Sequence, residues 1–234
     1  ESMGLDCQNV GGVQYPGTGF YFDGFTKTLV TAHIKGCYGG GYISSCIFAA
    51  CYQPLSHACI YDGSNVGLIV YASRFAIVSN NLCFQNGLNG IQVSFDSGGA
   101  IRQMGNVING NIIQQSGQAG IVMIGQDYAT VTSNTIDGAS KNYNNVYSAI
   151  DVQTCTNGVI GQNVTTDELV GNNTKYGIAL DAATSGMRLS QNRMTKGVLG
   201  AEINDLGTAN RNTPNGPIVW TPKSIPYADA SGAL

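Results

Sequence analysis

The sequence has few charged side chains and no long apolar run. Only 11% of its 234 residues are charged, and the formal net charge is -3. Nucleic-acid binding depends on clustered lysine and arginine, so we expect no nucleic-acid partner. A membrane-spanning helix needs about 20 consecutive apolar residues, and no such run occurs. We therefore expect no membrane insertion.

The cysteines do not form a recognisable framework. There are seven, an odd number, and none lies in a CxxC pair. A complete set of disulfides is therefore not expected, and we interpret most of these residues as small buried hydrophobes. Cys46, Cys51, His57 and Cys59 lie close together in the sequence and are of types that bind zinc, but their spacing matches no zinc signature. We predict neither a metal nor another cofactor.

No segment combines sustained 3.6-residue periodicity with helix caps. What the sequence does contain is a repeat, marked by five asparagines that recur about every 29 residues, with one shorter step of about 23 residues. They are Asn81, Asn111, Asn134, Asn163 and Asn192. Asparagine tolerates the left-handed backbone conformation, and its side chain can bond to the same residue one coil away. We therefore interpret this ladder as structural.

A second repeating pattern follows the first four asparagines. In it, apolar residues alternate along a short Gly-Ile-x-apolar strand. Its isoleucines are Ile91, Ile121, Ile150 and Ile178, which keep nearly the same period, and Ile60 lies about one period before the first of them. A coil of about 29 residues is too short to add a crossover helix to each strand. The sequence therefore predicts an all-β chain, a right-handed single-stranded parallel β-helix whose isoleucines stack in one buried column.

Both ends of the chain depart from the repeat. We expect residues 1–59 to form irregular first coils or a cap, residues 60–207 the regular β-helix, and residues 208–234 an extended tail. Four of the six prolines lie in that tail. The chain begins with Glu1 rather than Met, which indicates a processed chain or a fragment whose tail leads to a missing module.

The Asn-x-apolar turn followed by Gly-Ile-x-apolar, found across residues 60–203, resembles the pectate-lyase-like β-helix superfamily and, within it, bacteriophage tailspikes. Polygalacturonase-like motifs such as Gly-His-Gly and Arg-Ile-Lys do not occur. The resemblance implies a polysaccharide partner, from a bacterial capsule or O-antigen. It also implies a homotrimer and a location on a virion tail or otherwise outside the cell.

If the isoleucines point inward, the alternate residues point outward. One outward column then holds Gln92, Val122, Asp151, Ala179 and, if Ala201 continues the series, Glu202. A second holds Ser94, Ile124, Gln153, Asp181 and Asn204. Strand spacing puts the Cβ atoms of Asp151 and Asp181 roughly 8 Å apart. Two carboxylates roughly 6.5 to 9.5 Å apart suit an inverting glycosidase. We predict Asp151, Asp181 and Glu202 as the catalytic candidates.

Two insertions lie in the same coils. The first, at residues 141–147, contains Tyr143 and Tyr147, and the second, at residues 167–176, contains Lys175 and Tyr176. Binding groups concentrate on loops of rigid scaffolds. We therefore predict that these four residues bind substrate. Two outward residues on the strands, Gln92 and Gln153, are also predicted to bind it.

Three functions remain open. The first is a tailspike-like endo-glycosidase that uses the carboxylates for acid/base hydrolysis. The second is a carbohydrate-binding or adhesin-like β-helix without catalysis. The third is a polysaccharide lyase, for which Lys141, Lys175 and Arg188 are available as cations. Products with new reducing ends would indicate the first, an unchanged polymer the second, and unsaturated ends the third.

Overall fold

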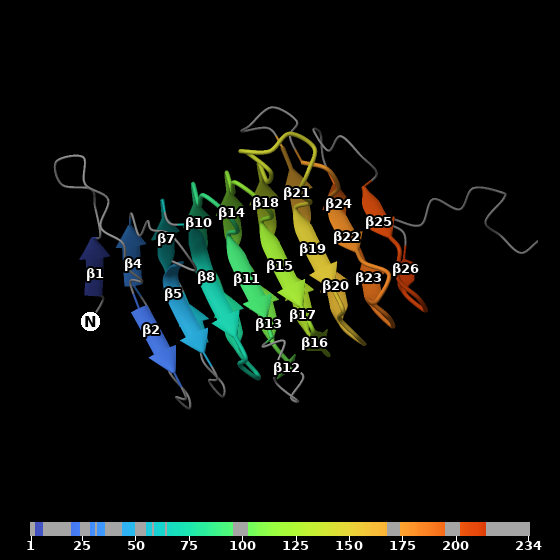
Figure 1. Ribbon diagram of the computed structural model, residues 1–234, viewed down its shortest axis with the longest axis horizontal. Helices are drawn as coiled ribbons and strands as arrows, with labels where there is room; N and C mark the ends of the chain where they lie inside the picture. The colour runs from blue at the N-terminus through green and yellow to red at the C-terminus, as the bar shows by residue number, and fades with distance from the viewer. Residues whose placement is uncertain are drawn as a thin grey trace, which may run out of the picture.

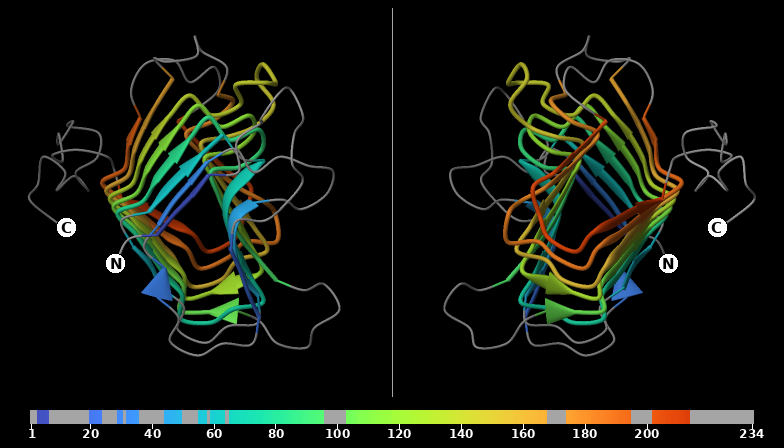
Figure 2. Two further views of the ribbon diagram at one scale, coloured as in Figure 1. Left: turned by 90° about the vertical axis from the view of Figure 1, so that its left-hand side faces the viewer. Right: turned by 90° about the vertical axis from the view of Figure 1, so that its right-hand side faces the viewer.

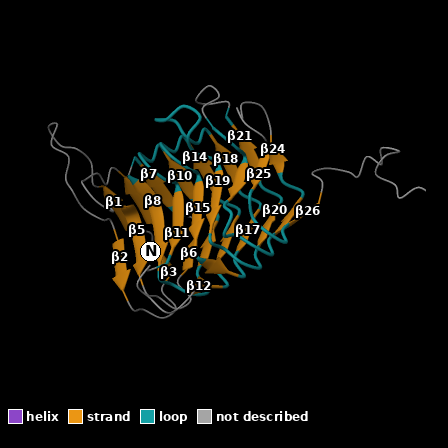
Figure 3. Ribbon diagram, turned by 45° about the vertical axis from the view of Figure 1, so that its right-hand side comes forward, coloured by secondary structure: helices purple, strands orange, loops and turns teal. Residues whose placement is uncertain are grey.

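The computed structural model shows a solenoid of parallel strands (Figures 1 and 3). It describes residues 3–6, 20–23, 29–30, 32–35, 44–49, 55–57, 59–63, 65–95, 103–167, 174–194 and 202–213. The strands within these residues form three eight-stranded sheets and one two-stranded sheet. Every pairing between neighbouring strands is parallel, so each strand hydrogen-bonds to its counterparts in the coils before and after it. The predicted parallel β-helix is confirmed.

The three large sheets are named in the order in which each coil visits them. Sheet 1 contains β1 (Met3–Asp6), β4 (Ala32–Lys35), β7 (Ile60–Asp62), β10 (Leu82–Phe84), β14 (Ile112–Gln114), β18 (Thr135–Asp137), β21 (Val164–Thr166) and β24 (Arg193–Met194). Sheet 2 contains β2 (Phe20–Asp23), β5 (Ser44–Ala49), β8 (Val66–Tyr71), β11 (Ile91–Ser94), β15 (Ile121–Ile124), β19 (Ile150–Gln153), β22 (Ile178–Leu180) and β25 (Ile203–Asp205).

Sheet 3 contains β3 (Leu29–Val30), β6 (Leu55–His57), β9 (Ile77–Ser79), β13 (Val107–Asn109), β17 (Thr130–Thr132), β20 (Val159–Gly161), β23 (Arg188–Ser190) and β26 (Arg211–Thr213). A short pair, β12 (Gln103–Met104) and β16 (Gln126–Asp127), lies between sheets 2 and 3. The end-on views show the three sheets surrounding one core (Figure 2).

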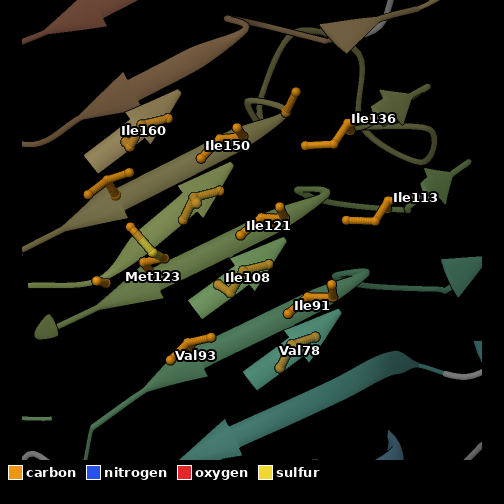
Figure 4. Close-up of a cluster of buried hydrophobic side chains, with 14 of the residues drawn as sticks. Val78, Ile91, Val93, Ile108, Ile113, Ile121, Met123, Ile136, Ile150 and Ile160 are labelled. Carbon is orange, nitrogen blue, oxygen red and sulfur yellow. The ribbon is translucent and has the colours of Figure 1, made fainter. Parts of the chain in front are cut away.

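The core consists of apolar side chains stacked coil on coil. Ile91, Ile121 and Ile150 lie in register (Figure 4). The pairing continues to Ile178, and none of the four has exposed surface. Sheet 3 contributes a facing column that includes Ile108. The alternation of apolar residues in each short strand therefore produces one continuous core, as predicted.

The asparagine ladder lies at the tight turn between sheets 3 and 1. Each of the first four ladder asparagines donates its backbone N–H and its Nδ2 to the Oδ1 of the asparagine one coil further on, at 2.9–3.1 Å. Each Nδ2 also donates to a backbone carbonyl of the coil before. All five side chains are buried. The predicted ladder is confirmed.

We expect Asn134→Ala to be costly because this side chain takes part in four hydrogen bonds, two accepted from Asn111 and two donated to Asn163 and Ile108. Buried groups left without a partner cost about 1 to 3 kcal/mol each, so a loss of about 4 kcal/mol in the free energy of unfolding is expected. Asn109→Ala, which removes one half-buried bond to Thr132, is the matched control and should cost under about 1 kcal/mol. Urea unfolding of both variants measures the difference, and equal losses would contradict a ladder that stabilises the fold.

Strand pairing is also observed on both sides of residues 60–207. Strands β1 to β6 already pair in parallel within the three sheets, so strand stacking starts well before residue 60. At the other end β26 pairs with β23, so the ladder continues to Thr213, beyond the expected end near Gly207. This last coil places Asp205 in register with Leu180 and Asn212 in register with Leu189, both at inward positions. Polar residues thus follow apolar ones at these two positions of the stack.

Candidate functional site

The outward face of sheet 2 carries the first predicted column. Gln92 pairs with Val122, Val122 with Asp151, and Asp151 with Ala179, as the repeat predicts. Outward does not mean exposed here, because Val122 is only 8% exposed and Asp151 is half-buried. Asp151 therefore sits on a strand face from which much of the surrounding water is excluded.

Glu202 does not belong to this column, and that part of the prediction is wrong. Ile203 pairs with Ile178, so Asn204 takes the position next to Ala179. Glu202 precedes β25, its side chain is exposed, and its backbone carbonyl accepts a hydrogen bond from the N–H of Ile178 at 3.0 Å. The inward position falls at Ile203 rather than at Ala201, which shifts the register. Two carboxylates, Asp151 and Asp181, remain at this face.

The Asp151 carboxyl group has an unusual environment. Its pKa is raised from 3.8 to about 6, chiefly because burial disfavours the charged form, while Lys175 lowers the pKa and the charge of Asp181 raises it. Both charges therefore lie within electrostatic range of Asp151. A carboxyl group with this pKa is partly protonated near neutral pH and can donate a proton as well as accept one.

Asp181 follows β22 directly and is held by the turn of the preceding coil. Its Oδ1 and Oδ2 both accept the backbone N–H of Thr154, at 3.0 and 3.1 Å, and its Oδ1 also accepts the hydroxyl of Thr184 at 2.7 Å. Thr154 has φ of 53°, a left-handed conformation that is uncommon for a β-branched residue. The carboxylate of Asp181 therefore fixes the turn at Thr154, within electrostatic range of Asp151.

Thr154 and Thr184 were missed by the sequence reasoning. Thr184 is buried, and its hydroxyl donates to Asp181 while also accepting the backbone N–H of Cys155 at 3.3 Å. The Asp-x-x-Thr spacing of Asp181 and Thr184 is typical of a local side-chain turn and could have indicated this bond. Thr154 could not have been found in this way, because it lies 27 residues from Asp181.

The two insertions are tied together beside this face. The carbonyl of Tyr147 accepts the N–H of Lys175 at 2.8 Å, and the hydroxyl of Thr174 donates to the carbonyl of Ala139 at 3.0 Å. The rings of Tyr143 and Tyr147 meet edge to face with centroids 5.4 Å apart. Residues 168–173 of the second insertion lie outside the described residues. The loops therefore offer aromatic rings anchored at their bases.

The remaining predicted binding residues lie as follows. The ammonium of Lys175 sits 5.2 Å from the ring centroid of Tyr176. On the strands, Gln153 is exposed, whereas Gln92 is half-buried and hydrogen-bonds with Asn89 at 3.1 Å and Ser94 at 3.4 Å. Gln92 is thus already engaged with neighbouring side chains, and Gln153 is the more available of the two for a ligand.

The cations considered for a lyase do not form one set. Lys141 is exposed and its Nζ donates to Gln115 at 3.2 Å. Arg188 lies on β23 in sheet 3, a different side of the solenoid from Asp151. Of the three, only Lys175 lies within electrostatic range of Asp151. This arrangement does not favour the lyase.

The cysteine-rich segment can be checked in part. Cys51 and the side chain of Cys46 lie outside the described residues. His57 is exposed and bonds to the hydroxyl of Ser79 at 2.9 Å, whereas Cys59 is buried in the core. In the part of the chain that the structure describes, no three His, Cys, Asp or Glu side chains gather as a metal site. In the same part, no helix is long and apolar enough to cross a membrane.

Stacked parallel sheets, a buried asparagine ladder and a half-buried carboxylate on sheet 2 define a right-handed parallel β-helix protein. Within that class, the family model described as "Periplasmic copper-binding protein (NosD)" matches residues 16–216. The chain therefore belongs to the NosD family. No curated protein matches its sequence.

Solved structures share the fold at low sequence identity. A protein named glycoside hydrolase is 13% identical with a TM-score of 0.58, and the match covers 85% of this chain and 38% of that one. The A-module of a mannuronan C-5 epimerase of Azotobacter vinelandii is 12% identical with a TM-score of 0.47, covering 78% and 64%. A tailspike protein 2 of a bacteriophage of Escherichia coli O157:H7 is 12% identical with a TM-score of 0.45, covering 76% and 29%. The chain spans less than two thirds of each.

Two described cysteines, Cys83 and Cys155, do not suit the copper in the family description. Copper is bound by soft ligands such as Cys, Met and His, and cysteine binds as the thiolate. Burial raises the pKa of the Cys83 thiol far above its usual range and that of Cys155 to about 11. Both thiols therefore stay protonated at neutral pH, in line with the packing role expected from the sequence.

Proposed function

We propose that the chain binds a polysaccharide along the outward face of sheet 2 and hydrolyses it by acid/base catalysis. The observation that carries this proposal is Asp151, a half-buried carboxyl group with a pKa of about 6. Asp181 and Lys175 lie within electrostatic range of it, and Lys175 belongs to one of the two insertions tied together beside it. A solved structure with the same fold is named a glycoside hydrolase, which is in line with the proposal.

In this reaction Asp151 is the general acid. It donates its proton to the glycosidic oxygen while the bond from that oxygen to the sugar carbon breaks. Asp181 accepts a proton from a water molecule whose oxygen forms the new bond to that carbon. Two residues related by one coil and two positions along a strand have Cβ atoms roughly 8 Å apart, a separation that suits the water of an inverting reaction. Tyr143 and Tyr147 offer their rings to neighbouring sugar units.

The test is incubation with a panel of bacterial capsular and O-antigen polysaccharides, followed by mass spectrometry of the products. Shorter fragments with new reducing ends are expected. Unsaturated ends would overturn the proposal in favour of a lyase. No cleavage of any polymer that the protein binds would overturn it in favour of binding alone.

Once a substrate is found, the pH profile tests the role of Asp151. The acid must be protonated, and its pKa is raised to about 6. We therefore expect kcat/KM to fall about tenfold per pH unit above roughly pH 6. Asp151→Glu, which keeps a titrating carboxyl group, should shift this limb rather than remove it. A rate that rises from pH 6 to pH 8 would contradict the assignment of Asp151 as the acid.

Carbohydrate binding without catalysis is the second candidate, and one observation favours it. Both carboxylate oxygens of Asp181 already accept protein hydrogen bonds, which is what a residue with a structural role would show. In that case Asp151 and Gln153 would bond to sugar hydroxyls. Cleavage in the polysaccharide panel decides between the two candidates.

We place this activity outside the cytoplasm. The family description names the periplasm, and this supports a periplasmic location for the chain over the virion tail. We also propose a homotrimer, and the resemblance to tailspikes is the one support for it. The polymer is proposed to be a bacterial surface polysaccharide, since such a substrate is met outside the cytoplasm.

A further inference from the structure

Three exposed arginines lie on the last described strands of sheets 3 and 1, whereas Asp151 lies on sheet 2. Arg188 on β23 and Arg211 on β26 are direct partners in the parallel register, and both are exposed. Strands pair at about 4.8 Å, so the two guanidinium groups leave the sheet side by side. Arg193 on β24 is exposed on the other side of the asparagine turn.

The described strands around the arginines contain no carboxylate. The sequences of β20, β21, β23, β24 and β26 are VIG, VTT, RLS, RM and RNT, without Asp or Glu. Like charges placed directly opposite each other in a sheet are destabilising. Two of the 11 basic residues of the chain nevertheless lie in register, an arrangement that favours an anionic ligand.

A row of exposed, hydrogen-bonded side chains ends close in sequence to Arg188 and Arg193. The hydroxyl of Ser133 donates to Oε1 of Gln162 at 3.4 Å, and Nε2 of Gln162 donates to Oε1 of Gln191 at 3.1 Å. This direction leaves the amide donor of Gln191 at the end of the row, between Arg188 and Arg193 in sequence. Guanidinium and amide donors together suit oxyanions flanked by hydroxyl groups.

We propose that Arg188, Arg211 and Arg193, with Gln191, form a binding site for an anionic polysaccharide on the edge between sheets 3 and 1. The ligand presents carboxylate or sulfate groups to the arginines and hydroxyl groups to the amides. A lipid surface is less suited to this edge, because the exposed large hydrophobic residues of the described chain lie on other strands and loops. The site is separate from Asp151 and does not depend on catalysis there.

The test uses dextran sulfate and dextran, which share a backbone and differ in charge. We expect the parent protein to bind dextran sulfate at least tenfold more tightly than dextran by isothermal titration calorimetry, with affinity that falls between 50 and 200 mM NaCl. Arg188→Gln combined with Arg211→Gln should lose at least tenfold in affinity. Arg74→Gln, on a different coil, is the matched control and should bind as the parent does.

Further measurements separate the alternatives. Asp151→Asn should bind dextran sulfate as the parent does, so loss of cleavage and loss of this site are read independently. Equal binding by the parent and the double arginine variant would overturn the proposal. Binding to phosphatidylglycerol vesicles but not to dextran sulfate would also overturn it, in favour of a membrane contact. Inorganic sulfate should compete with dextran sulfate, and failure to compete at tenfold its concentration in sulfate groups would contradict an oxyanion site.

Discussion

Ile121→Asp should leave the chain unfolded at 25 °C. Ile121 has no exposed surface and lies in register between Ile91 and Ile150. The substitution removes an apolar side chain worth about 2 to 5 kcal/mol and places an unpaired charge in the core, at a cost of several kcal/mol more. Folded proteins are stable by about 5 to 15 kcal/mol, so the sum is enough to remove the native state.

Ile112→Asp is the matched control for this prediction. Ile112 lies on β14 with 47% of its surface exposed, so the same chemical change meets water rather than core. It should change the free energy of unfolding by less than about 1 kcal/mol. Circular dichroism of the two variants shows the contrast. A folded Ile121→Asp protein with the strand signal of the parent would contradict the buried column.

The fold could be predicted because each coil repeats the same types of residue at equivalent positions. The asparagine needs a neighbour of its own kind one coil away, and the isoleucine needs an apolar partner above and below, so both recur with nearly the same period along the sequence. Asn134 and Ile150 are therefore placed correctly without any structure. The NosD family was not predicted, because a repeat of this kind specifies architecture and many families share it.

The site was predicted less well, for two physical reasons. Register errors accumulate where coils change length, and the step from Ile178 to Ile203 is shorter than each step between the earlier isoleucines of the column, which removed Glu202 from the face. Hydrogen bonds between coils also leave no local pattern in the sequence, so the bond from the N–H of Thr154 to Asp181 could not be predicted. The raised pKa of Asp151 depends on burial by its surroundings, which alternation along one strand does not reveal.

Asp151→Asn should abolish cleavage and stabilise the protein at the same time. An amide cannot donate the proton that the leaving group needs, and loss of a general acid or base typically costs 100-fold to 10,000-fold in turnover. The stability effect follows from the pKa, which folding raises from 3.8 to about 6. The native state then holds the proton more tightly than the unfolded chain, so the contribution of Asp151 to stability is fully present below about pH 4 and is lost as the pH rises through about 6.

That loss amounts to at most about 3 kcal/mol, since one pKa unit corresponds to about 1.36 kcal/mol. The asparagine side chain of the variant does not titrate, so the variant should not lose stability in this way as the pH rises. We therefore expect Asp151→Asn to unfold at higher urea concentration than the parent at pH 8 and at nearly the same concentration at pH 4. A variant that is less stable than the parent at pH 8 would contradict the burial of a charge at this position.

Asp181→Asn is the matched comparison, and its stability should change in the opposite direction. Its two oxygens accept the N–H of Thr154, and Oδ1 also accepts the hydroxyl of Thr184. An amide replaces one acceptor with a donor that faces the N–H of Thr154, so a loss of about 1 to 3 kcal/mol in the free energy of unfolding is expected.

If Asp181 is also the base, turnover falls as well, even where the variant remains fully folded. If both variants cleave the substrate as the parent does, the reaction takes place elsewhere on the molecule. If turnover is lost in Asp151→Asn and kept in folded Asp181→Asn, Asp151 is the acid and Asp181 only holds the turn beside it.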